Sequence, residues 1–219
     1  MSVAEHKKSV KLEPHEVKYH VYLGLAYERL ASTLTEKDQQ EKTLLNAIVS
    51  YKRGTELNPG NAYYWGNLGR AYAMLSQLKG SREDYIKAVS YYEEAIRRAP
   101  VTGLFYNNLI DLYLRGGLTD RALPMLSTLE SIDAGLAAGA YFMAGNVFFS
   151  GKNFEDAERS YLKALSLKPD IYQALHNLGV VYAATKQNKK ARAYLEKFLE
   201  VMPGSDMADN ARKILKEIK

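Results

Sequence analysis

The sequence predicts an all-α solenoid of stacked helical hairpins, and three observations support this fold class. Five of the six prolines follow apolar stretches, at spacings of 45, 41, 69 and 34 residues. Small residues and aromatic residues recur in phase with these prolines. Because proline lacks the N–H that a helix interior needs, its recurrence near a period of about 34 residues indicates repeated helix ends. The five prolines are Pro14, Pro59, Pro100, Pro169 and Pro203.

The composition narrows the class of protein. The chain has 219 residues, of which 47% are hydrophobic, so it can bury a sizeable core. Cysteine is absent, which excludes a disulfide framework and a thiolate metal site. No apolar run reaches the ~18 residues of a membrane-spanning helix, and the N-terminus carries charges where a secretory signal would be apolar. A cytoplasmic location is therefore the default expectation, although the composition does not fix the compartment.

The best-formed repeat begins at Ala62. Its first half carries large apolar residues and a glycine at helical spacing, and its second half carries alanines around a tyrosine. These residues are Trp65, Leu68, Gly69 and Tyr72, followed by Ala88, Tyr92, Ala95 and Pro100. The pattern resembles the tetratricopeptide repeat (TPR), a helix–turn–helix unit of about 34 residues, and it recurs along nearly the whole chain. The resemblance implies a right-handed superhelix that binds a protein or peptide.

The register of this motif divides the chain into five repeats with a helix at each end. Repeats one to five cover residues 17–61, 62–102, 103–137, 138–171 and 172–205. Residues 1–16 have two interpretations: the second helix of a truncated preceding repeat, or an N-terminal capping helix. Residues 206–219 are predicted to form a C-terminal capping helix, with Ser205 as its N-cap.

The first two repeats are longer than the TPR unit, by 11 and 7 residues. At about 3.6 residues per turn, these insertions lengthen both helices of a hairpin and nearly keep them in phase. Ser81 is the expected N-cap of the second helix of repeat two, with Asp84 three residues further on. The four long helices are predicted at 17–33, 37–57, 62–78 and 82–98.

Repeat three departs from the pattern. Pro124 falls inside its second helix, where it removes a backbone hydrogen bond and should bend the helix. Ala134 stands where most of the other repeats have their terminal proline. The glycine- and alanine-rich run Ala134–Ala140 then predicts a looser connection to repeat four.

The resemblance also implies that the first helices of the repeats line a concave groove that binds a peptide. Asn67, Asn108 and Asn177 share one groove position, where an amide can both donate to and accept from a peptide backbone. Ordinary polar contacts are the alternative interpretation. Phe142 and Phe149 predict a partly apolar ligand. The candidate groove residues are Tyr63, Asn67, Arg70, Met74, Asn107, Asn108, Asp111, Arg115, Phe142, Asn146, Phe149, His176 and Asn177.

Motifs for chemistry are missing from the sequence. The four histidines lack metal-ligand spacing, and neither a glycine-rich phosphate loop nor a nucleophile elbow occurs. We therefore predict a non-enzymatic chain with no catalytic residue, metal ion or cofactor. A chaperone-type carboxylate clamp is not expected either, because Phe142 stands where that clamp needs a lysine.

Two alternative functions stay open at this stage. The lengthened early repeats are similar to the C-terminal TPR regions of bacterial O-antigen ligase-like and polymerase-like membrane proteins. This similarity implies an accessory or regulatory domain of a membrane glycan enzyme, outside the cytoplasm. Separately, residues 172–219 hold nine basic and five acidic side chains, which would suit nucleic acid or an anionic lipid surface. An ordinary mixed-charge helical surface is favoured, because phosphate binding needs a denser basic stripe.

Overall fold

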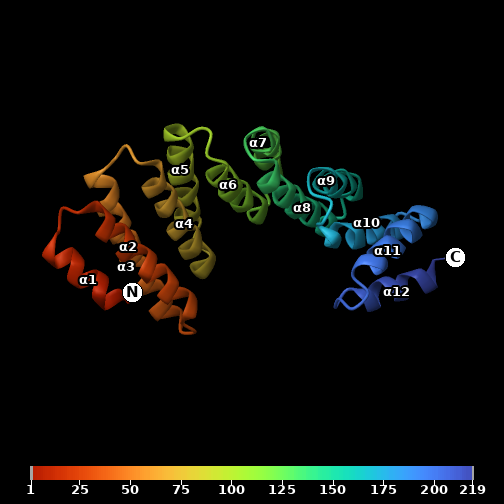
Figure 1. Cartoon of the computed structure of the whole chain (residues 1–219), viewed down its shortest axis with the longest axis horizontal. Helices are drawn as coiled ribbons and strands as arrows, with labels where there is room; N and C mark the ends of the chain where they lie inside the picture. Colours follow the sequence, from red (N-terminus) through yellow and green to blue (C-terminus); the bar gives the residue numbers. More distant parts are fainter. Residues whose placement is uncertain (1, 219) are drawn as a thin grey trace. The chain divides into compact units, whose positions relative to one another are not determined.

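The computed structural model describes residues 2–218, and across this range the secondary structure consists of twelve α-helices with no β-strand (Figure 1). The all-helical prediction is confirmed. The chain divides into two compact units, Met1–Leu112 and Tyr113–Lys219. We call them the N-terminal unit and the C-terminal unit.

The N-terminal unit is built from two long helical hairpins and their neighbours. Helices α2 and α3 form the first hairpin, α4 and α5 form the second, α1 packs against α2, and α4 packs against α3. The predicted ranges of the four hairpin helices are confirmed, with α4 one residue longer than expected. The helices are α1 (Val3–Leu12), α2 (Val17–Thr33), α3 (Lys37–Leu57), α4 (Ala62–Lys79), α5 (Arg82–Arg98) and α6 (Gly103–Arg115), whose last three residues belong to the C-terminal unit.

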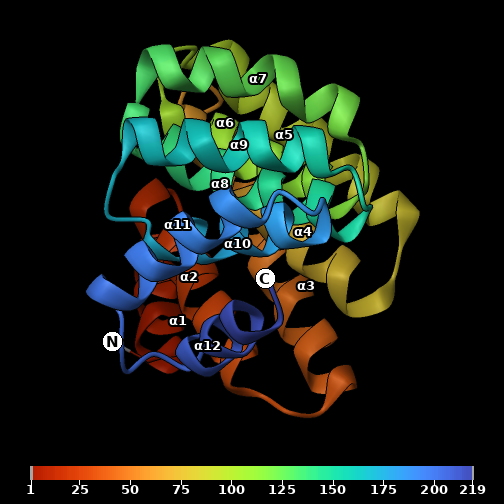
Figure 2. The same ribbon diagram turned by 90° about the vertical axis from the view of Figure 1, so that its right-hand side faces the viewer.

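The C-terminal unit repeats this arrangement with shorter helices. Figure 2 shows α8 beside α9 and α10 beside α11, and α12 packs against both α10 and α11. Ala211 on α12 is fully buried there, and Leu195 and Phe198 of α11 belong to the same apolar cluster. The helices are α7 (Thr119–Ile132), α8 (Ala134–Ser150), α9 (Phe154–Leu167), α10 (Tyr172–Ala184), α11 (Asn188–Val201) and α12 (Ala208–Glu217).

A glycine on the first helix of a hairpin makes room for an aromatic ring from the second helix. A Cβ atom on Gly24 would lie 2.4 Å from the ring of Tyr51, and a Cβ atom on Gly145 would lie 2.5 Å from the ring of Tyr161. Both tyrosines have no exposed surface. The close approach of the two helices therefore depends on these glycines. Because each ring packs against the first helix, the tyrosine hydroxyl lies on the first-helix side of its hairpin.

The connection between α7 and α8 is tighter than predicted. The looser connection expected over Ala134–Ala140 is wrong, because these residues form the first turns of α8. Asp133 ends α7 and also caps α8, since its Oδ1 accepts a hydrogen bond from the Leu136 N–H at 2.9 Å. Alanine has the highest helix propensity, and this favours the helix over a flexible linker. Pro124 lies inside α7 as expected, and the bend that it should cause stays a prediction.

One of the two predicted N-caps is confirmed and the other is wrong. Ser81 caps α5 as predicted, because its side-chain oxygen accepts a hydrogen bond from the Asp84 N–H at 3.2 Å. The prediction for Ser205 is wrong, since α12 starts at Ala208 and Met207 precedes it. The Ala208 N–H donates to the Ser205 carbonyl at 2.9 Å, so the backbone turns at Ser205 before the helix begins. The division into repeats and the two interpretations of residues 1–16 stay predictions.

Candidate binding surface

The thirteen candidate groove residues lie on four first helices, and each unit holds part of the set. In the N-terminal unit, Tyr63, Asn67, Arg70 and Met74 are on α4, and Asn107, Asn108 and Asp111 are on α6. In the C-terminal unit, Arg115 ends α6, Phe142, Asn146 and Phe149 are on α8, and His176 and Asn177 are on α10. The structure brings two groups of them together, one in each unit.

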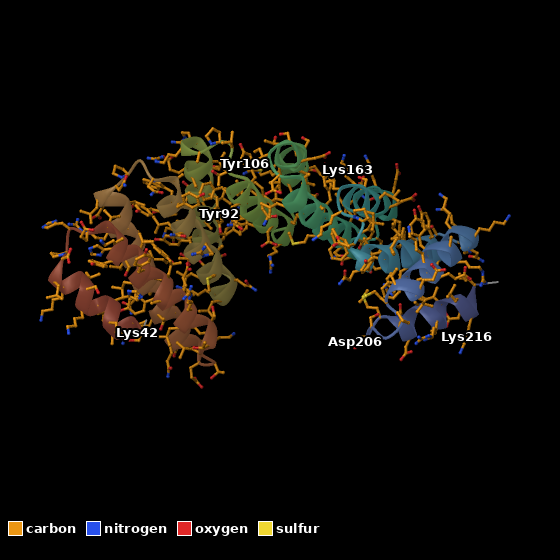
Figure 3. The ribbon with its side chains drawn as sticks, in the orientation of Figure 1. Lys42, Tyr92, Tyr106, Lys163, Asp206 and Lys216 are labelled. Atoms are coloured by element: carbon orange, nitrogen blue, oxygen red, sulfur yellow. The ribbon has the colours of Figure 1, made fainter. Side chains whose placement is uncertain are left out.

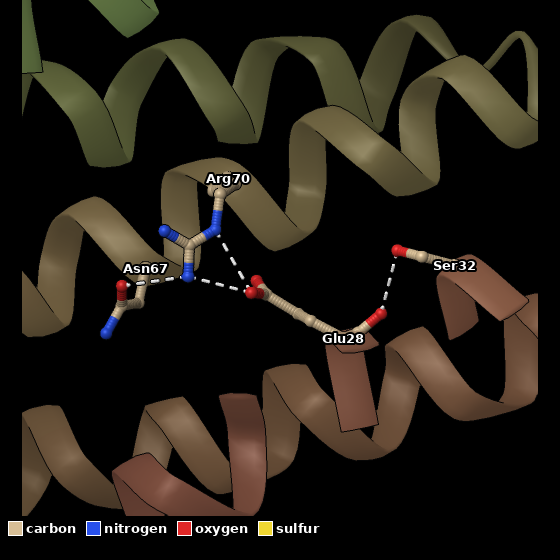
Figure 4. A network of polar contacts seen from close by, with 4 residues as sticks. All are labelled: Glu28, Ser32, Asn67 and Arg70. Atoms are coloured by element: carbon tan, nitrogen blue, oxygen red, sulfur yellow. Dashed lines mark hydrogen bonds and ion pairs between the residues drawn. The ribbon is translucent and has the colours of Figure 1, made fainter. Parts of the chain in front are cut away.

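The group in the N-terminal unit is a charged cluster that joins α2 to α4 (Figure 4). Glu28 Oε2 accepts hydrogen bonds from Arg70 Nε at 3.0 Å and from Arg70 Nη2 at 2.7 Å. Arg70 Nη2 also donates to Asn67 Oδ1 at 3.1 Å. The Glu28 side chain is 8% exposed and the Arg70 side chain 37% exposed, so the carboxylate lies beneath the guanidinium. We call Glu28, Asn67, Arg70 and Tyr51 the charged cluster.

Tyr51 completes this cluster from α3, beneath the ion pair. Its hydroxyl and Glu28 Oε1 are both buried, and neither has a hydrogen-bond partner of good geometry among residues 2–218, although the hydroxyl is close enough to interact with Glu28 and Arg70. Burial raises the pKa of the Glu28 carboxyl, and the Arg70 charge opposes that rise. Burial and the negative charge of Glu28 raise the pKa of the Tyr51 hydroxyl, which therefore stays protonated. Tyr92 of α5 lies in the interior of the same unit (Figure 3). Burial raises its pKa, and the charges of Arg70 and Glu28 also act on it, in opposite directions.

The group in the C-terminal unit surrounds a pocket with a volume of about 340 Å³. Four of the candidate residues line it: Asn146, Phe149, His176 and Asn177. The other lining residues are Ser150, Tyr161, Val180 and Asn210. The pocket therefore joins side chains from α8, α9, α10 and α12, and we call it the amide pocket.

Hydrogen bonds fix the polar wall of the amide pocket. Asn146 Oδ1 accepts from the Tyr161 hydroxyl at 2.8 Å and from Asn177 Nδ2 at 3.0 Å. Burial raises the pKa of Tyr161 to about 12, so this hydroxyl remains a donor at neutral pH. All three groups are uncharged at neutral pH.

His176 closes one side of the pocket. Its Nδ1 lies 3.1 Å from Asn177 Oδ1 and its Nε2 lies 2.9 Å from Asn210 Oδ1. The ring also packs edge-on against Phe198, with 5.2 Å between ring centroids. Only 6% of His176 is exposed. This buried histidine therefore links α10 to α12 through its contact with Asn210.

The remaining candidates are outside the charged cluster as defined above and are not among the residues that line the amide pocket. Tyr63 is 55% exposed and packs edge-on against Phe105, and the half-buried Phe142 packs against Tyr161. Arg115 is exposed at the end of α6. Met74, Asn107, Asn108 and Asp111 are half-buried along α4 and α6.

Sequence reasoning missed Glu28, Tyr51, Tyr161 and Asn210. Glu28 occupies a groove position of repeat one, so the repeat register could have found it. Tyr51 and Tyr161 belong to the aromatic residues that recur in the repeats; this pattern indicates the packing of their rings and gives no role for their hydroxyls. Asn210 lies in α12, outside the five repeats, and no sequence signal pointed to it.

Within residues 2–218, no cluster of three or more histidine, aspartate or glutamate side chains could hold a metal ion. No helix in the same range has the length and apolarity that a membrane crossing requires.

Sequence comparison identifies the repeat family. Three sequence models of the tetratricopeptide repeat match residues 74–139, 145–186 and 172–203. Together they cover more than half of the chain. They reach from the middle of α4 to the turn after α11, and so they include the amide pocket apart from Asn210.

Curated relatives match at low identity and are longer than this chain. The BBSome complex member BBS4 homolog of Drosophila melanogaster is 23% identical over 87% of this chain and 37% of its own length. The human protein O-mannosyl-transferase TMTC3 is 29% identical over 73% of this chain and 17% of its own length. The TPR repeat-containing protein MJ1428 of Methanocaldococcus jannaschii is 20% identical over 79% of this chain and 31% of its own length. The chain thus spans about a sixth to about a third of these relatives.

Solved structures share the fold. The YrrB structure, described as a TPR protein with an unusual peptide-binding site, aligns with a TM-score of 0.61 and 20% identity, covering 95% of this chain and 97% of YrrB. PilW, described as a type IV pilus biogenesis factor, aligns with a TM-score of 0.67 and 15% identity, covering 94% of this chain and 87% of PilW. The chain belongs to the tetratricopeptide repeat family, whose arrays serve as scaffolds for protein–protein interaction.

Proposed function

We propose that the chain binds an extended segment of a partner protein in the amide pocket. The observation that carries this proposal is the convergence of four candidate groove residues, together with Asn210, on one pocket of about 340 Å³. This volume lies near the lower end of the range for ligand pockets, which is about 300–1,000 Å³. A pocket of this size suits one or two residues of an extended chain better than a whole helix.

The chemistry of the pocket matches a peptide. Phe149 and Val180 supply an apolar wall for a side chain. Asn146 Nδ2 has no hydrogen-bond partner among residues 2–218, because its oxygen is the atom that accepts from Tyr161 and Asn177. Asn210 uses one end of its amide on His176 Nε2 and presents the other end to the pocket. The Asn146 donor and the free end of the Asn210 amide, beside an apolar wall, fit a segment that presents backbone polar groups next to an apolar side chain.

The pocket walls are held in place without a ligand. The chain of hydrogen bonds from Tyr161 through Asn146 and Asn177 to His176 fixes the rotamers of the polar side chains. A preformed site loses little conformational entropy on binding, so a short segment can bind with useful affinity.

A peptide selection tests this proposal. Random 12-residue peptides displayed on phage would be selected on the full chain, and the affinity of an enriched peptide would be measured by calorimetry. We expect Asn146→Ala and Asn210→Ala each to weaken binding about tenfold, which corresponds to about 1.4 kcal/mol and to one lost hydrogen bond. Asn46→Ala on the exposed side of α3 is the matched control and should leave the affinity unchanged. Unchanged affinity in both pocket variants would place the peptide elsewhere.

A role beside a membrane glycan enzyme is the second candidate. It rests on the similarity to the human O-mannosyl-transferase TMTC3, in which the matched region is 17% of the length. In this proposal the amide pocket holds a segment of the enzyme or of an accessory protein. The gene that encodes this chain provides the test: several membrane-spanning segments in the same reading frame would support it, and a reading frame limited to the repeats would contradict it.

The basic surface at the C-terminal end is the weakest of the three candidates. Arg192 lies 3.6 Å from Glu196 and Arg212 lies 2.8 Å from Asp209, so acidic neighbours offset part of the positive charge. Binding of random-sequence DNA at 50 mM salt, falling steeply as salt rises, would revive this candidate.

A further inference from the structure

A second pocket of the C-terminal unit lies between the second helices α7 and α9. Its volume is about 480 Å³, within the range of about 300–1,000 Å³ for ligand pockets. Figure 1 and Figure 2 both show α7 and α9 on the same side of α8, which adds Tyr141 and Phe148 to the lining. The pocket shares no lining residue with the amide pocket. We call it the α7–α9 pocket.

The chain itself fills the equivalent space one repeat further on. Tyr182 of α10 corresponds to Phe148 of α8, because the two residues lie 34 positions apart, which is one repeat length. The Tyr182 ring packs against Tyr194 of α11, with 5.4 Å between ring centroids. Lys190 Nζ lies 4.8 Å from the centroid of the Tyr182 ring. An aromatic ring and a cation from α11 thus cover Tyr182.

The N-terminal unit fills its own equivalent space in the same way. Tyr72 of α4 stacks on Tyr91 of α5, with 5.3 Å between ring centroids and 17° between ring planes. Lys87 Nζ of α5 lies 5.6 Å from the centroid of the Tyr72 ring. Two other repeats therefore cover the aromatic ring of the first helix with the same pair of side chains, a tyrosine and a lysine from the second helix.

Repeat four lacks both covering side chains. Ser160 and Asp156 lie 34 positions before Tyr194 and Lys190, so they take the corresponding places on α9. A serine is too short to cover the Phe148 ring, and an aspartate has the wrong charge to lie over it. The space that a tyrosine fills in repeats two and five is therefore open in repeat four, and it forms the α7–α9 pocket.

Leu162 gives the pocket an apolar wall at a position that is polar in the other repeats. It lies five residues after Ala157 on α9, and 37% of it is exposed. Leu123 of α7 also lines the pocket and is 40% exposed. Two exposed leucines beside an uncovered ring suit an apolar ligand group. The residues that correspond to Leu162 in the other second helices are Lys52, Glu93, Ser127 and Glu196.

The rim of the pocket presents positive charge. Arg159 pairs with Asp156, and Lys163 Nζ lies 2.7 Å from Glu130 Oε1. In each pair the cation is the more exposed partner: the side chains of Arg159 and Asp156 are 72% and 30% exposed, and those of Lys163 and Glu130 are 39% and 28% exposed. An approaching segment meets the cations first, which favours acidic residues in that segment.

We propose that the α7–α9 pocket receives one aromatic side chain from an acidic segment of a partner protein. The ring lies on Phe148 between Leu123 and Leu162, in the place that Tyr194 takes in repeat five. Acidic residues beside the ring face Arg159 and Lys163. The site is on the second helices, so the proposal does not rest on peptide binding in the amide pocket.

Methyl NMR of the full chain tests the pocket, because an aromatic ring shifts the signals of methyl groups that it contacts. The probes are three capped tripeptides, Ac-Asp-Phe-Asp-NH2, Ac-Lys-Phe-Lys-NH2 and Ac-Asp-Leu-Asp-NH2. The methyl signals of Leu123 and Leu162 would be followed up to about 10 mM probe. We expect saturable shifts with the acidic aromatic probe and at least about tenfold weaker binding of the basic probe at low salt. The leucine probe should cause no ring-current shift.

Two variants give the pocket the residues of repeat five. Leu162→Glu introduces the residue found at Glu196, and it should weaken the acidic aromatic probe at least about tenfold, measured on the Leu123 signals. Ser160→Tyr introduces the missing ring and should have the same effect. Leu45→Glu is the matched control, because Leu45 is a 44% exposed leucine of α3 in the other unit, and the affinity should be unchanged.

Each contrary result overturns the proposal in a recognisable way. No saturation with the acidic aromatic probe, or an unchanged affinity in Leu162→Glu, would show that the ring binds elsewhere or not at all. Equal affinity for the acidic and basic probes would reject the acidic segment. Methyl shifts that depend on protein concentration without any probe would assign the pocket to a second copy of the chain. Asn146→Ala should leave this titration unaltered, so the α7–α9 pocket and the amide pocket can fail separately.

Discussion

The two units share the same contact between helices but have different polar surfaces beside it. In each unit a second-helix tyrosine packs its ring against a first-helix glycine, Tyr51 on Gly24 and Tyr161 on Gly145. The Tyr161 hydroxyl donates to a neutral amide, whereas the Tyr51 hydroxyl lies near the partly exposed pair of Glu28 and Arg70 and has no hydrogen-bond partner of good geometry among residues 2–218. The repeat thus fixes where the hydroxyl arrives, and one neighbouring side chain decides whether the surface is neutral or charged.

The largest expected effect comes from breaking the ion pair. Arg70→Met leaves the carboxylate of Glu28 buried without a positive partner. We expect a loss of about 3 kcal/mol in the free energy of unfolding, the low end of the range for buried pairs, because the Arg70 side chain is partly exposed. Urea denaturation at pH 7 measures it. The double variant Arg70→Met with Glu28→Gln removes the charge and should recover most of the loss, and a double variant as unstable as the single one would contradict this account.

A smaller effect should follow from filling the space at the glycine contact. Gly24→Ala places a Cβ atom 2.4 Å from the Tyr51 ring, and overpacking of this kind costs about 1–3 kcal/mol. Gly139→Ala on α8 is the matched control, because a Cβ atom there meets nothing within 4 Å. It should stabilise the protein by about 0.5–1 kcal/mol through helix propensity. Thermal unfolding compares the two, and a stabilising Gly24→Ala would refute the proposed packing.

Removing each tyrosine hydroxyl should change the stability of the two units by different amounts. Tyr161→Phe deletes a donor to Asn146 and should cost about 1 kcal/mol, the usual net value of one hydrogen bond. Tyr51→Phe deletes a buried hydroxyl that has no hydrogen-bond partner of good geometry in the described part of the chain, so it should be neutral or slightly stabilising. The measurement is the urea midpoint of each variant. A costly Tyr51→Phe would mean that the hydroxyl donates to Glu28 or another group in solution.

The fold could be predicted from the sequence because each repeat carries the same pattern of residues. Proline, glycine and aromatic residues recur in phase, and this redundancy placed the four long helices within one residue. The failures came where one local signal was used alone. The composition of Ala134–Ala140 alone predicts a looser connection, but Asp133 supplies a cap and alanine favours helix. Ser205 has the chemistry of an N-cap, but a backbone turn comes before the helix.

The candidate surface was only partly accessible for a different reason. Register alone placed Asn146, His176 and Asn177 near one another, since the first helices of neighbouring repeats pack side by side. It could not show that Asn210 from α12 joins them, because that contact depends on a helix outside the repeat pattern. It also could not separate free amide groups from those used internally, which requires the hydrogen-bond geometry.

The smallest expected effect is the dependence of stability on pH in the charged cluster. Burial is the main influence on Glu28, and it raises the folded-state pKa above the usual 4.5. The charged and titratable groups that act on it are Arg70, from α4, and Tyr51, from α3. A group with a raised folded-state pKa contributes stability below its unfolded pKa and loses it as pH rises through the folded value. Wild type should therefore lose stability relative to Glu28→Gln as pH rises from about 4.5, and the difference in stability should level off above the folded-state pKa of Glu28.

Urea denaturation of both proteins between pH 4 and pH 8 tests the sign of this pH dependence. A difference that instead favours wild type with rising pH would show that the attraction of Arg70 outweighs burial. In the C-terminal unit, Tyr161→Phe should show the same cost at every pH in this range, because the groups that it touches do not titrate there.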